Sequence, residues 1–319
     1  MKTIKVIEKL REKISNKPSD FQAVEDLFEM IRIYENENSK AAHALNREVR
    51  SITAAQVKNN KNPVNIREKF YWLHKRSLLF DALIDFDAYL QYVEFDREPS
   101  KRFYLPRRRI IRPIVDSLQQ IEDDELDLLA ISQPPGTGKS TLGIFFLSWQ
   151  MGKYPDMPNL ASAHSDKLTR SFYDGVLSII TDPEYLWSDV FPGVQIVGTN
   201  SKDETIDLGK SKRFKTLTCR SIDGSLTGAT RCERILYADD LVSGIEEALS
   251  KDRLDNLWGK YTNDLKSRKK LGCKEIHIAT RWSVHDPIGR LERQYEGNSR
   301  AKFLALPALD ENEGIGGIL

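Results

Sequence analysis

The sequence predicts an α/β fold in which a mainly parallel sheet is flanked by helices, with an N-terminal helical region ahead of it. Three observations lead to this prediction. Residues 1–100 carry apolar side chains at helical spacing, whereas short apolar runs alternate with helical segments from about residue 101. The first of these runs leads through a loop rich in proline and glycine into an apolar helix. Such alternation is typical of a parallel sheet covered on both faces.

The first hundred residues are expected to form helices. The apolar positions that recur at helical spacing are Ile4, Ile7, Leu10, Ile14, Val24, Leu27, Phe28 and Ile31. A cap at Ser19 is expected to start the second of these helices, and a longer helical pattern follows the break at Pro63. The charged segment 96–100, which contains Pro99, interrupts the pattern. We therefore expect a helical region over 1–100 and a second domain over 101–310.

Four apolar runs in the second domain are predicted to be strands. They cover residues 126–131, 159–163, 235–238 and 275–279. A helix is predicted over 142–149, directly after the first strand and its loop.

The loop after the first predicted strand has the composition of a phosphate-binding loop. It consists of Gln133, Pro134, Pro135, Gly136, Thr137, Gly138, Lys139, Ser140 and Thr141. This stretch fits the end of the pattern G-x-x-x-x-G-K-[ST], although Gln133 stands where the first glycine is usual. Glycines let backbone N–H groups turn toward phosphates, and the helix N-terminus adds partial positive charge. We expect Lys139 to neutralise the β- and γ-phosphates of ATP and Ser140 to bind Mg²⁺. The alternative is an ordinary turn with a surface lysine.

The third predicted strand ends in two acids, Asp239 and Asp240. In nucleotide-binding proteins the first acid after such a strand holds magnesium and a second activates the attacking water. We expect these roles for Asp239 and Asp240 respectively. Glu246 and Glu247 are rival candidates for the base. The alternative is that the acidic pair only caps a helix or forms a turn.

The fourth predicted strand is followed by Thr280, Arg281 and Trp282. In P-loop motors that act on DNA, a polar residue at a strand end near the γ-phosphate senses hydrolysis. Thr280 has the position for this role. The alternative is a turn after the strand, with Trp282 packed into the core.

Composition restricts the class of protein. Lys and Arg number 48 against 47 for Asp and Glu, and this balance argues against a protein that coats nucleic acid indiscriminately. Two local basic runs, 107–109 and 266–270, remain candidates for phosphate contact. The histidines and the three cysteines are too scattered for a zinc site. There is no signal peptide and no apolar stretch near the roughly 20 residues that span a bilayer, so we expect a soluble intracellular protein.

Four segments together resemble the large terminase subunits of tailed bacteriophages. They are residues 134–141, residues 225–228 (Ser-Leu-Thr-Gly), residues 235–240 with Glu-Glu-Ala at 246–248, and Ala-Thr-Arg-Trp at 279–282 followed by Asp-Pro-Ile-Gly-Arg-Leu at 286–291. The last segment discriminates best between P-loop families. The resemblance covers about residues 100–310, and the first hundred residues add little to it.

The resemblance implies an ATP-driven motor that threads double-stranded DNA into a procapsid in the host cytoplasm. It implies a P-loop NTPase fold of RecA-like/ASCE type, with ATP and Mg²⁺ as cofactors. Its expected partners are DNA, the portal protein, the small terminase subunit and further copies of the chain in a ring, expected to be a pentamer. No membrane is involved.

The resemblance also suggests further site residues. A segment before the phosphate loop contacts adenine in the family, and Tyr104 and Arg107 are the candidates here. Family members often use an arginine from a neighbouring subunit. Arg231 fits best by position, and Arg220 and Arg281 stay open.

The family continues into a nuclease domain with several metal-binding acids. Here the chain stops soon after Glu311, so residues 311–319 are expected to be a tail toward a nuclease domain that was removed or lies on another chain. The acids at strand ends are assigned to ATP-bound magnesium, and residues 122–125 (Glu-Asp-Asp-Glu) are expected to form a solvated loop. Nuclease activity is therefore not expected.

Two other functions stay open. A stand-alone helicase or an AAA-type remodelling ATPase would use the same loop, although a helicase should carry further nucleic-acid motifs. A nucleotide-sensing assembly subunit would bind ATP without hydrolysing it.

Overall fold

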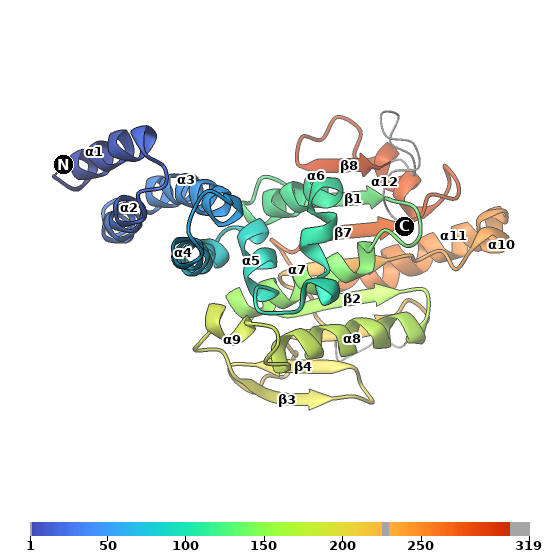
Figure 1. Ribbon diagram of the computed structural model, residues 1–319. Helices are drawn as coiled ribbons and strands as arrows, with labels where there is room; N and C mark the ends of the chain where they lie inside the picture. Colours follow the sequence, from blue (N-terminus) through green and yellow to red (C-terminus); the bar gives the residue numbers. More distant parts are fainter. Residues whose placement is uncertain (1, 225–229, 307–319) are drawn as a thin grey trace. The chain divides into compact units, whose positions relative to one another are not determined.

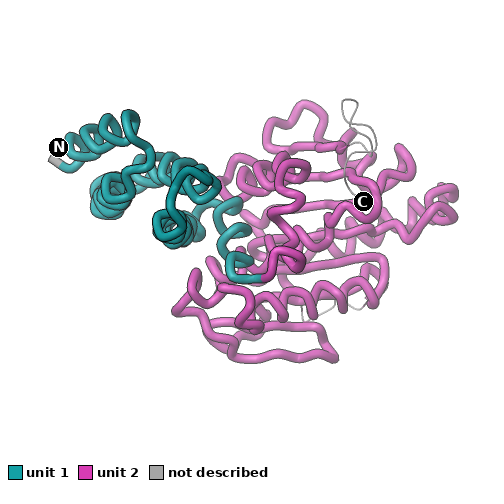
Figure 2. The backbone as a smooth tube through the Cα atoms, in the orientation of Figure 1, with its two compact units in different colours: residues 1–97 teal, residues 98–319 magenta. Residues whose placement is uncertain are grey.

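A computed structural model describes residues 2–224 and 230–306 of the chain. The chain divides into two compact units, residues 1–97 and residues 98–319 (Figure 2). The division lies within the segment 96–100 that interrupts the helical pattern in the sequence. Residues 225–228 and 307–319, including the tail 311–319, lie outside the described residues.

The first unit consists of helices. They are α1 (Lys2–Asn16), α2 (Phe21–Tyr34), α3 (Ser39–Lys58), α4 (Val64–Ala82) and α5 (Phe86–Val93). Their shared core includes Ile7, Leu27, Phe28 and Phe70, all nearly inaccessible to solvent. The helical nature of this region is confirmed. The expected cap at Ser19 is wrong, because the carboxylate of Asp20 accepts the hydrogen bond from the Ala23 backbone N–H, 3.1 Å away.

The second unit is built on one eight-stranded sheet with the strand order β3-β4-β5-β2-β6-β7-β1-β8 (Figure 1). The strands are β1 (Leu128–Ser132), β2 (Asn159–Ala163), β3 (Ile196–Asn200), β4 (Thr205–Leu208), β5 (Leu217–Ser221), β6 (Ile235–Asp239), β7 (Lys274–Ala279) and β8 (Ala301–Ala305). Only β4 runs antiparallel to its neighbours; the other pairings are parallel. The predicted α/β class with a mainly parallel sheet is confirmed. All four predicted strands are present, and β3, β4, β5 and β8 are additional.

Helices cover both faces of the sheet. They are α6 (Tyr104–Glu122), α7 (Lys139–Lys153), α8 (Asp166–Thr181), α9 (Trp187–Val190), α10 (Ile245–Ala248), α11 (Lys251–Lys260) and α12 (Pro287–Gln294), with the short helices η1 (Pro99–Lys101), η2 (Tyr261–Leu265) and η3 (Lys266–Arg268). On one face, Leu236 and Ala238 of β6 pack in a core with Leu254 of α11 and Leu291 of α12. On the other face, Tyr237 contacts Phe172 of α8 and lies directly against Gly143 of α7. Alternate residues of β6 therefore face opposite helix layers.

Strand β7 begins in a cluster of buried charges. Glu275 is inaccessible to solvent and accepts hydrogen bonds from Tyr261, from Lys269 (2.6 Å) and from the ring of His277 (2.7 Å). Burial would raise the pKa of Glu275, but the bond and charge of His277 and the charge of Lys269 outweigh burial and lower it. The preceding residue, Lys274, pairs with Asp124 and Asp127. The start of β7 is therefore tied to its surroundings on several sides.

The segment 122–125 differs from the expected solvated loop. Glu122 ends α6 with a side chain only 6% exposed, and it pairs with Lys153 and Arg234. Asp124, by contrast, is exposed and pairs with Lys274 and Arg300. Among the described residues, no helix is long and apolar enough to cross a bilayer.

Candidate active site

The predicted phosphate loop connects β1 to α7, as the sequence indicates. Gly136 and Gly138 have φ angles of 79° and 85°, a left-handed conformation that glycine adopts without strain. Gly138 is required for a second reason, because a β-carbon there would lie 2.5 Å from the ring of Phe103. The helix α7 then begins at Lys139, so its N-terminus points into the loop. This arrangement presents backbone N–H groups and a helix dipole to an anion.

Lys139 is held by the ends of two neighbouring strands. Its side chain is 7% exposed, and its Nζ lies 2.8 Å from a carboxylate oxygen of Asp240 and donates to Thr280 Oγ1 at 2.9 Å. Asp240 directly follows β6, and Thr280 directly follows β7. The parallel order β1-β7-β6 places all three groups at one edge of the sheet, formed by the carboxyl ends of these strands.

Ser140 and Asp239 form a second pair at this edge. The Ser140 hydroxyl donates to Asp239 Oδ2 at 2.6 Å. Burial, together with the nearby charge of Asp240, raises the pKa of Asp239 to about 7, although the bond from Ser140 and the charge of Lys139 oppose the shift. The other oxygen, Oδ1, is buried without a hydrogen-bond partner. Oxygen donors are what Mg²⁺ prefers, so a hydroxyl beside an unpartnered carboxylate oxygen fits that ion.

Asp240 adopts an unusual backbone conformation. Its φ angle is 41°, in the left-handed region that side chains other than those of Asn and Asp seldom adopt. Its backbone N–H donates to Ile278 O at 2.8 Å, and its carboxylate accepts from the Thr280 backbone N–H at 2.9 Å. The ring of His164 lies 2.7 Å from its carbonyl oxygen. Strain of this kind is concentrated at functional sites in proteins.

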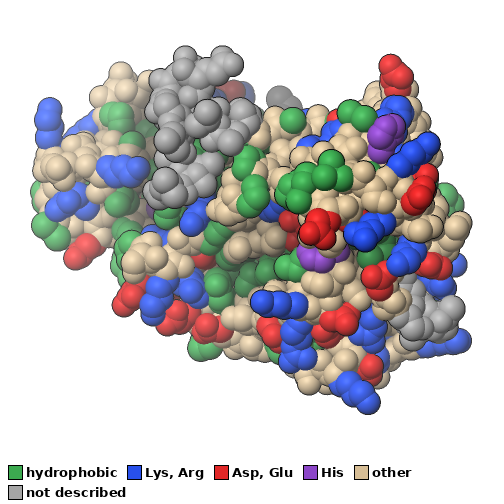
Figure 3. Space-filling view, turned by 90° about the vertical axis from the view of Figure 1, so that its right-hand side faces the viewer, with side chains coloured by type: hydrophobic (Ala, Val, Ile, Leu, Met, Phe, Trp, Pro, Cys, Tyr) green, Lys and Arg blue, Asp and Glu red, His purple; other side chains and the backbone are tan. Residues whose placement is uncertain are grey.

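Lys139, Asp240 and Thr280 line a cleft of about 560 Å³. Its lining consists of Phe103, Arg107, Pro135, Gly136, Gly138, Lys139, Ser140, Thr141, His164, Asp240, Val242, Ser243, Thr280 and Trp282. The arrows of β1, β2 and β7 in Figure 1 point toward the side that faces the viewer in Figure 3. Figure 3 shows acidic, basic and histidine side chains meeting on this side beside a group of hydrophobic ones. The cleft has the size of a small-molecule site.

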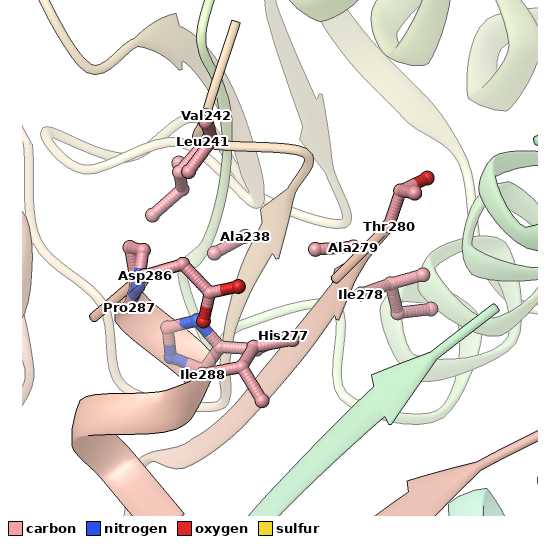
Figure 4. Close-up of a pocket in the computed structure, with 10 residues that line it drawn as sticks. All are labelled: Ala238, Leu241, Val242, His277, Ile278, Ala279, Thr280, Asp286, Pro287 and Ile288. Atoms are coloured by element: carbon pink, nitrogen blue, oxygen red, sulfur yellow. The ribbon is translucent and has the colours of Figure 1, made fainter. Parts of the chain in front are cut away.

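A second, much smaller cavity lies between β6, β7 and the start of α12. Its volume is about 10 Å³, room for about one water molecule. In Figure 4 the hydroxyl of Thr280 points away from His277 and Asp286, which lie together at the other side of the view. The cleft, and not this cavity, therefore has room for a ligand.

The structure brings together most of the predicted site residues. Lys139, Ser140, Asp239, Asp240 and Thr280 contact one another directly. Arg107 lines the cleft as well, and it stacks 5.2 Å from the ring centre of Phe103. In the loop itself, Gln133, Pro134 and Thr137 do not line the cleft; Thr137 donates to Pro134 O at 3.0 Å and closes the turn.

Three candidates lie elsewhere. Tyr104 is not brought to the cleft, because its position in α6 turns its side chain into the core, where it is fully buried. Glu246 is exposed on the short helix α10 and does not line the cleft. Arg231 pairs with Glu233 ahead of the first residue of β6, at the edge of the sheet opposite Asp239.

Sequence reasoning missed five residues that line the cleft: Phe103, His164, Val242, Ser243 and Trp282. A signal for His164 was present, because it directly follows the predicted strand 159–163. Carboxyl ends of parallel strands meet at one edge, so the residue after each predicted strand is a site candidate. Phe103 precedes its helix and has no comparable signal.

A search of protein-family models and a search of curated proteins gave no match to this chain. The chemistry of the cleft follows from its own groups. A lysine, a helix N-terminus and a glycine loop attract a polyphosphate, a hydroxyl beside a carboxylate suits Mg²⁺, and a second carboxylate can accept a proton. Together these groups can bind a polyphosphate and a divalent cation and can accept a proton beside them.

Proposed function

We propose that this chain is a Mg²⁺-dependent ATPase of the P-loop type and the motor of a DNA-packaging terminase. One observation carries the ATPase proposal. Lys139 at the start of α7 bonds simultaneously to the acid after β6 and to the threonine after β7. Residues distant in the sequence thus meet around the lysine that a triphosphate would need.

The strand order supports the finer assignment to the RecA-like/ASCE type. That type has an additional strand between the strand before the phosphate loop and the strand that ends in the acidic pair. Here β7 occupies this position between β1 and β6, and it ends next to Thr280. The polar residue expected to sense the γ-phosphate would therefore lie beside the two acids.

Each residue then has a defined task. Lys139 would leave its hydrogen bonds to Asp240 and Thr280 and bind the β- and γ-phosphates instead. The N–H groups of the loop would bind the same phosphates. Ser140 and Asp239 would hold Mg²⁺, which supplies positive charge against the phosphates when bound. Asp240, released from Lys139, would accept a proton from the attacking water. Thr280 would pass the loss of the γ-phosphate to the loop behind it.

The motor proposal rests on the segment after β7. Arg281 pairs with Asp286, the N-cap of α12, and with Glu292 within that helix. The loop after Thr280 is therefore joined to a helix by charges, which suits a segment that transmits a change at the nucleotide. Double-stranded DNA, the portal protein, the small terminase subunit and a homo-oligomeric ring, proposed to be a pentamer, are the partners that belong to this function.

The test is ATP hydrolysis by the purified chain with Mg²⁺, measured alone, with double-stranded DNA and with procapsids. We expect hydrolysis that DNA and procapsids stimulate. Lys139→Ala should fold normally and lose turnover by on the order of 10²-fold or more, because a preorganised charge against the phosphates is removed. Normal turnover in Lys139→Ala would exclude this loop as the site. Stimulation by single-stranded but not double-stranded DNA would favour a helicase.

A further inference from the structure

We infer that His164 is a positioning residue that holds Asp240 in its left-handed conformation and so fixes the place of its carboxylate. The inference rests on the proposed ATPase function. It concerns the histidine that directly follows β2, whose side chain reaches the residue after the neighbouring strand β6.

The contact fixes the position of a proton. The Nδ1 atom of His164 lies 2.7 Å from the carbonyl oxygen of Asp240. A carbonyl oxygen can only accept a hydrogen bond, so Nδ1 must carry the hydrogen and donate. In the neutral ring, Nε2 is then without a hydrogen. The minor tautomer of free histidine is therefore the one that this contact requires.

The hydrogen bond from His164 is made to a residue with a strained backbone, Asp240. A non-glycine residue with a φ angle of 41° is strained, because its β-carbon crowds the following carbonyl. The N–H of Asp240 is bound to Ile278 O at 2.8 Å, which fixes the peptide group ahead of it. His164 fixes the peptide group behind it by holding the carbonyl. Together the two bonds clamp both sides of the strained residue.

These two hydrogen bonds determine the direction of the Asp240 carboxylate. In this conformation the carboxylate of Asp240 accepts from the Thr280 N–H at 2.9 Å and lies 2.8 Å from Lys139 Nζ. The aspartate side chain is short, so the backbone conformation of Asp240 largely determines where its carboxylate lies. The next two residues, Leu241 and Val242, are buried in the core and anchor the chain after the turn. A small relaxation at Asp240 would therefore move the carboxylate away from the reacting water.

The test compares two replacements of His164 with one control. In His164→Asn the side-chain amide places an N–H donor near the position of Nδ1, whereas His164→Leu has no donor. His74 lies in α4 of the first unit, where its Nδ1 atom is 2.9 Å from Thr53 Oγ1, and His74→Leu is the matched control. We expect kcat for ATP to fall on the order of 10- to 100-fold in His164→Leu, with KM unchanged, because misplacing a reacting group by about 1 Å has effects of that size. His164→Asn should recover most of the loss, and the control should match the wild type.

A measurement that needs no turnover accompanies the kinetics. The ¹⁵N NMR spectrum of the histidine rings at pH 8, assigned with His164→Asn, should show His164 with its hydrogen on Nδ1. A hydrogen on Nε2 would overturn the contact itself, whether or not the chain hydrolyses ATP.

The kinetic results distinguish a failure of this inference from a failure of the proposed function. Equal losses in the Asn and Leu variants, or a rise in KM with unchanged kcat, would show that His164 does not act by donating to Asp240. No loss in either variant would overturn the inference as well. A wild-type chain without any ATPase activity would instead refute the proposed function, and the ring spectrum would still decide whether the clamp exists.

Discussion

In the second unit, buried carboxylates lie both at the amino ends and at the carboxyl ends of the parallel strands. They differ in how many hydrogen bonds they accept. At the amino edge, both carboxylate oxygens of Glu122 have donors: Lys153 and Tyr154 on one, Gln150 and Arg234 on the other. At the carboxyl edge, Oδ1 of Asp239 is buried without a partner. The neighbouring Asp240 is strained.

The pKa shifts of the two buried carboxyls follow this difference. Burial would raise the pKa of Glu122, but the charges and bonds of Lys153, Gln150 and Arg234 outweigh it and lower the pKa. Burial raises the pKa of Asp239 to about 7, because its partners are too few. Glu122 is fully bonded within the fold, whereas one oxygen of Asp239 is left open to a ligand. The contrast predicts a structural role for Glu122 and supports the role proposed for Asp239.

The sharpest test of the functional edge replaces the carboxylate of Asp240. Asp240→Asn should lower kcat on the order of 10²- to 10⁴-fold, the usual contribution of a general base, and should leave Mg²⁺-ATP binding intact. Asparagine tolerates a positive φ angle, so the backbone should not change. Glu246→Gln is the matched variant on the exposed helix α10, and we expect normal turnover. The reverse result in steady-state kinetics would transfer the base to Glu246.

The opposite edge should respond in stability and not in catalysis. Glu122→Ala leaves Lys153 and Arg234 buried without their carboxylate, which should lower the free energy of unfolding by about 3–5 kcal/mol. Denaturant titration measures this change. Asp124→Ala, which removes an exposed partner of Lys274 and Arg300, should have a much smaller effect. If Glu122→Ala is as stable as the wild type but has a lower kcat for ATP, the distinction between the two edges is wrong.

The smallest expected effect is a pH dependence of Mg²⁺-nucleotide binding. The folded protein holds the proton of Asp239 more strongly than the unfolded chain does. This stabilising contribution is therefore present at low pH and is lost as the pH rises through about 7. Mg²⁺ needs the ionised carboxylate, so binding should strengthen by up to about tenfold per pH unit below that value and level off above it.

Fluorescence titration of a nucleotide analogue between pH 6 and 8 measures this dependence. Titration without Mg²⁺ controls for the nucleotide's own protonation. Asp239→Asn should abolish the Mg²⁺-dependent part. An unchanged pH profile in that variant would assign the proton to another group.

The sequence predicted the elements whose signals are local. The strand, glycine turn and helix around residues 128–153 are encoded by contiguous residues, and so are β2, β6 and β7. Strand β3 was missed because all of its residues are exposed, so no buried face leaves a pattern. Helix α3 lies within the predicted helical region 1–100 but was not delimited, because large apolar residues are sparse in it. Strand β5 is buried but contains Thr218 and Arg220, which hide its period.

The candidate site was predictable where strand ends could be placed in order along the chain. Lys139, Ser140, Asp239, Asp240 and Thr280 follow from their strands and meet at one edge. The contacts of His164 depend on which strands are neighbours, and the sequence gives no strand order. The position of Arg231 at the opposite edge was predictable, because Arg231 precedes the strand that Asp239 ends. The left-handed turn at Asp240 has no signal, because aspartate is common in many other conformations.

The anchored start of β7 has a mechanical consequence. Glu275 accepts hydrogen bonds from Tyr261, Lys269 and His277. Lys274 forms ion pairs with two further acids. These contacts oppose a shift of the strand along its axis. Thr280 follows the other end of the same strand. A displacement of Thr280 should therefore move the residues after it and not the strand. The segment that follows is 281–286, which Arg281 couples to α12 through Asp286 and Glu292. If the chain is the proposed motor, strand β7 should therefore stay in place and the loop after Thr280 should move.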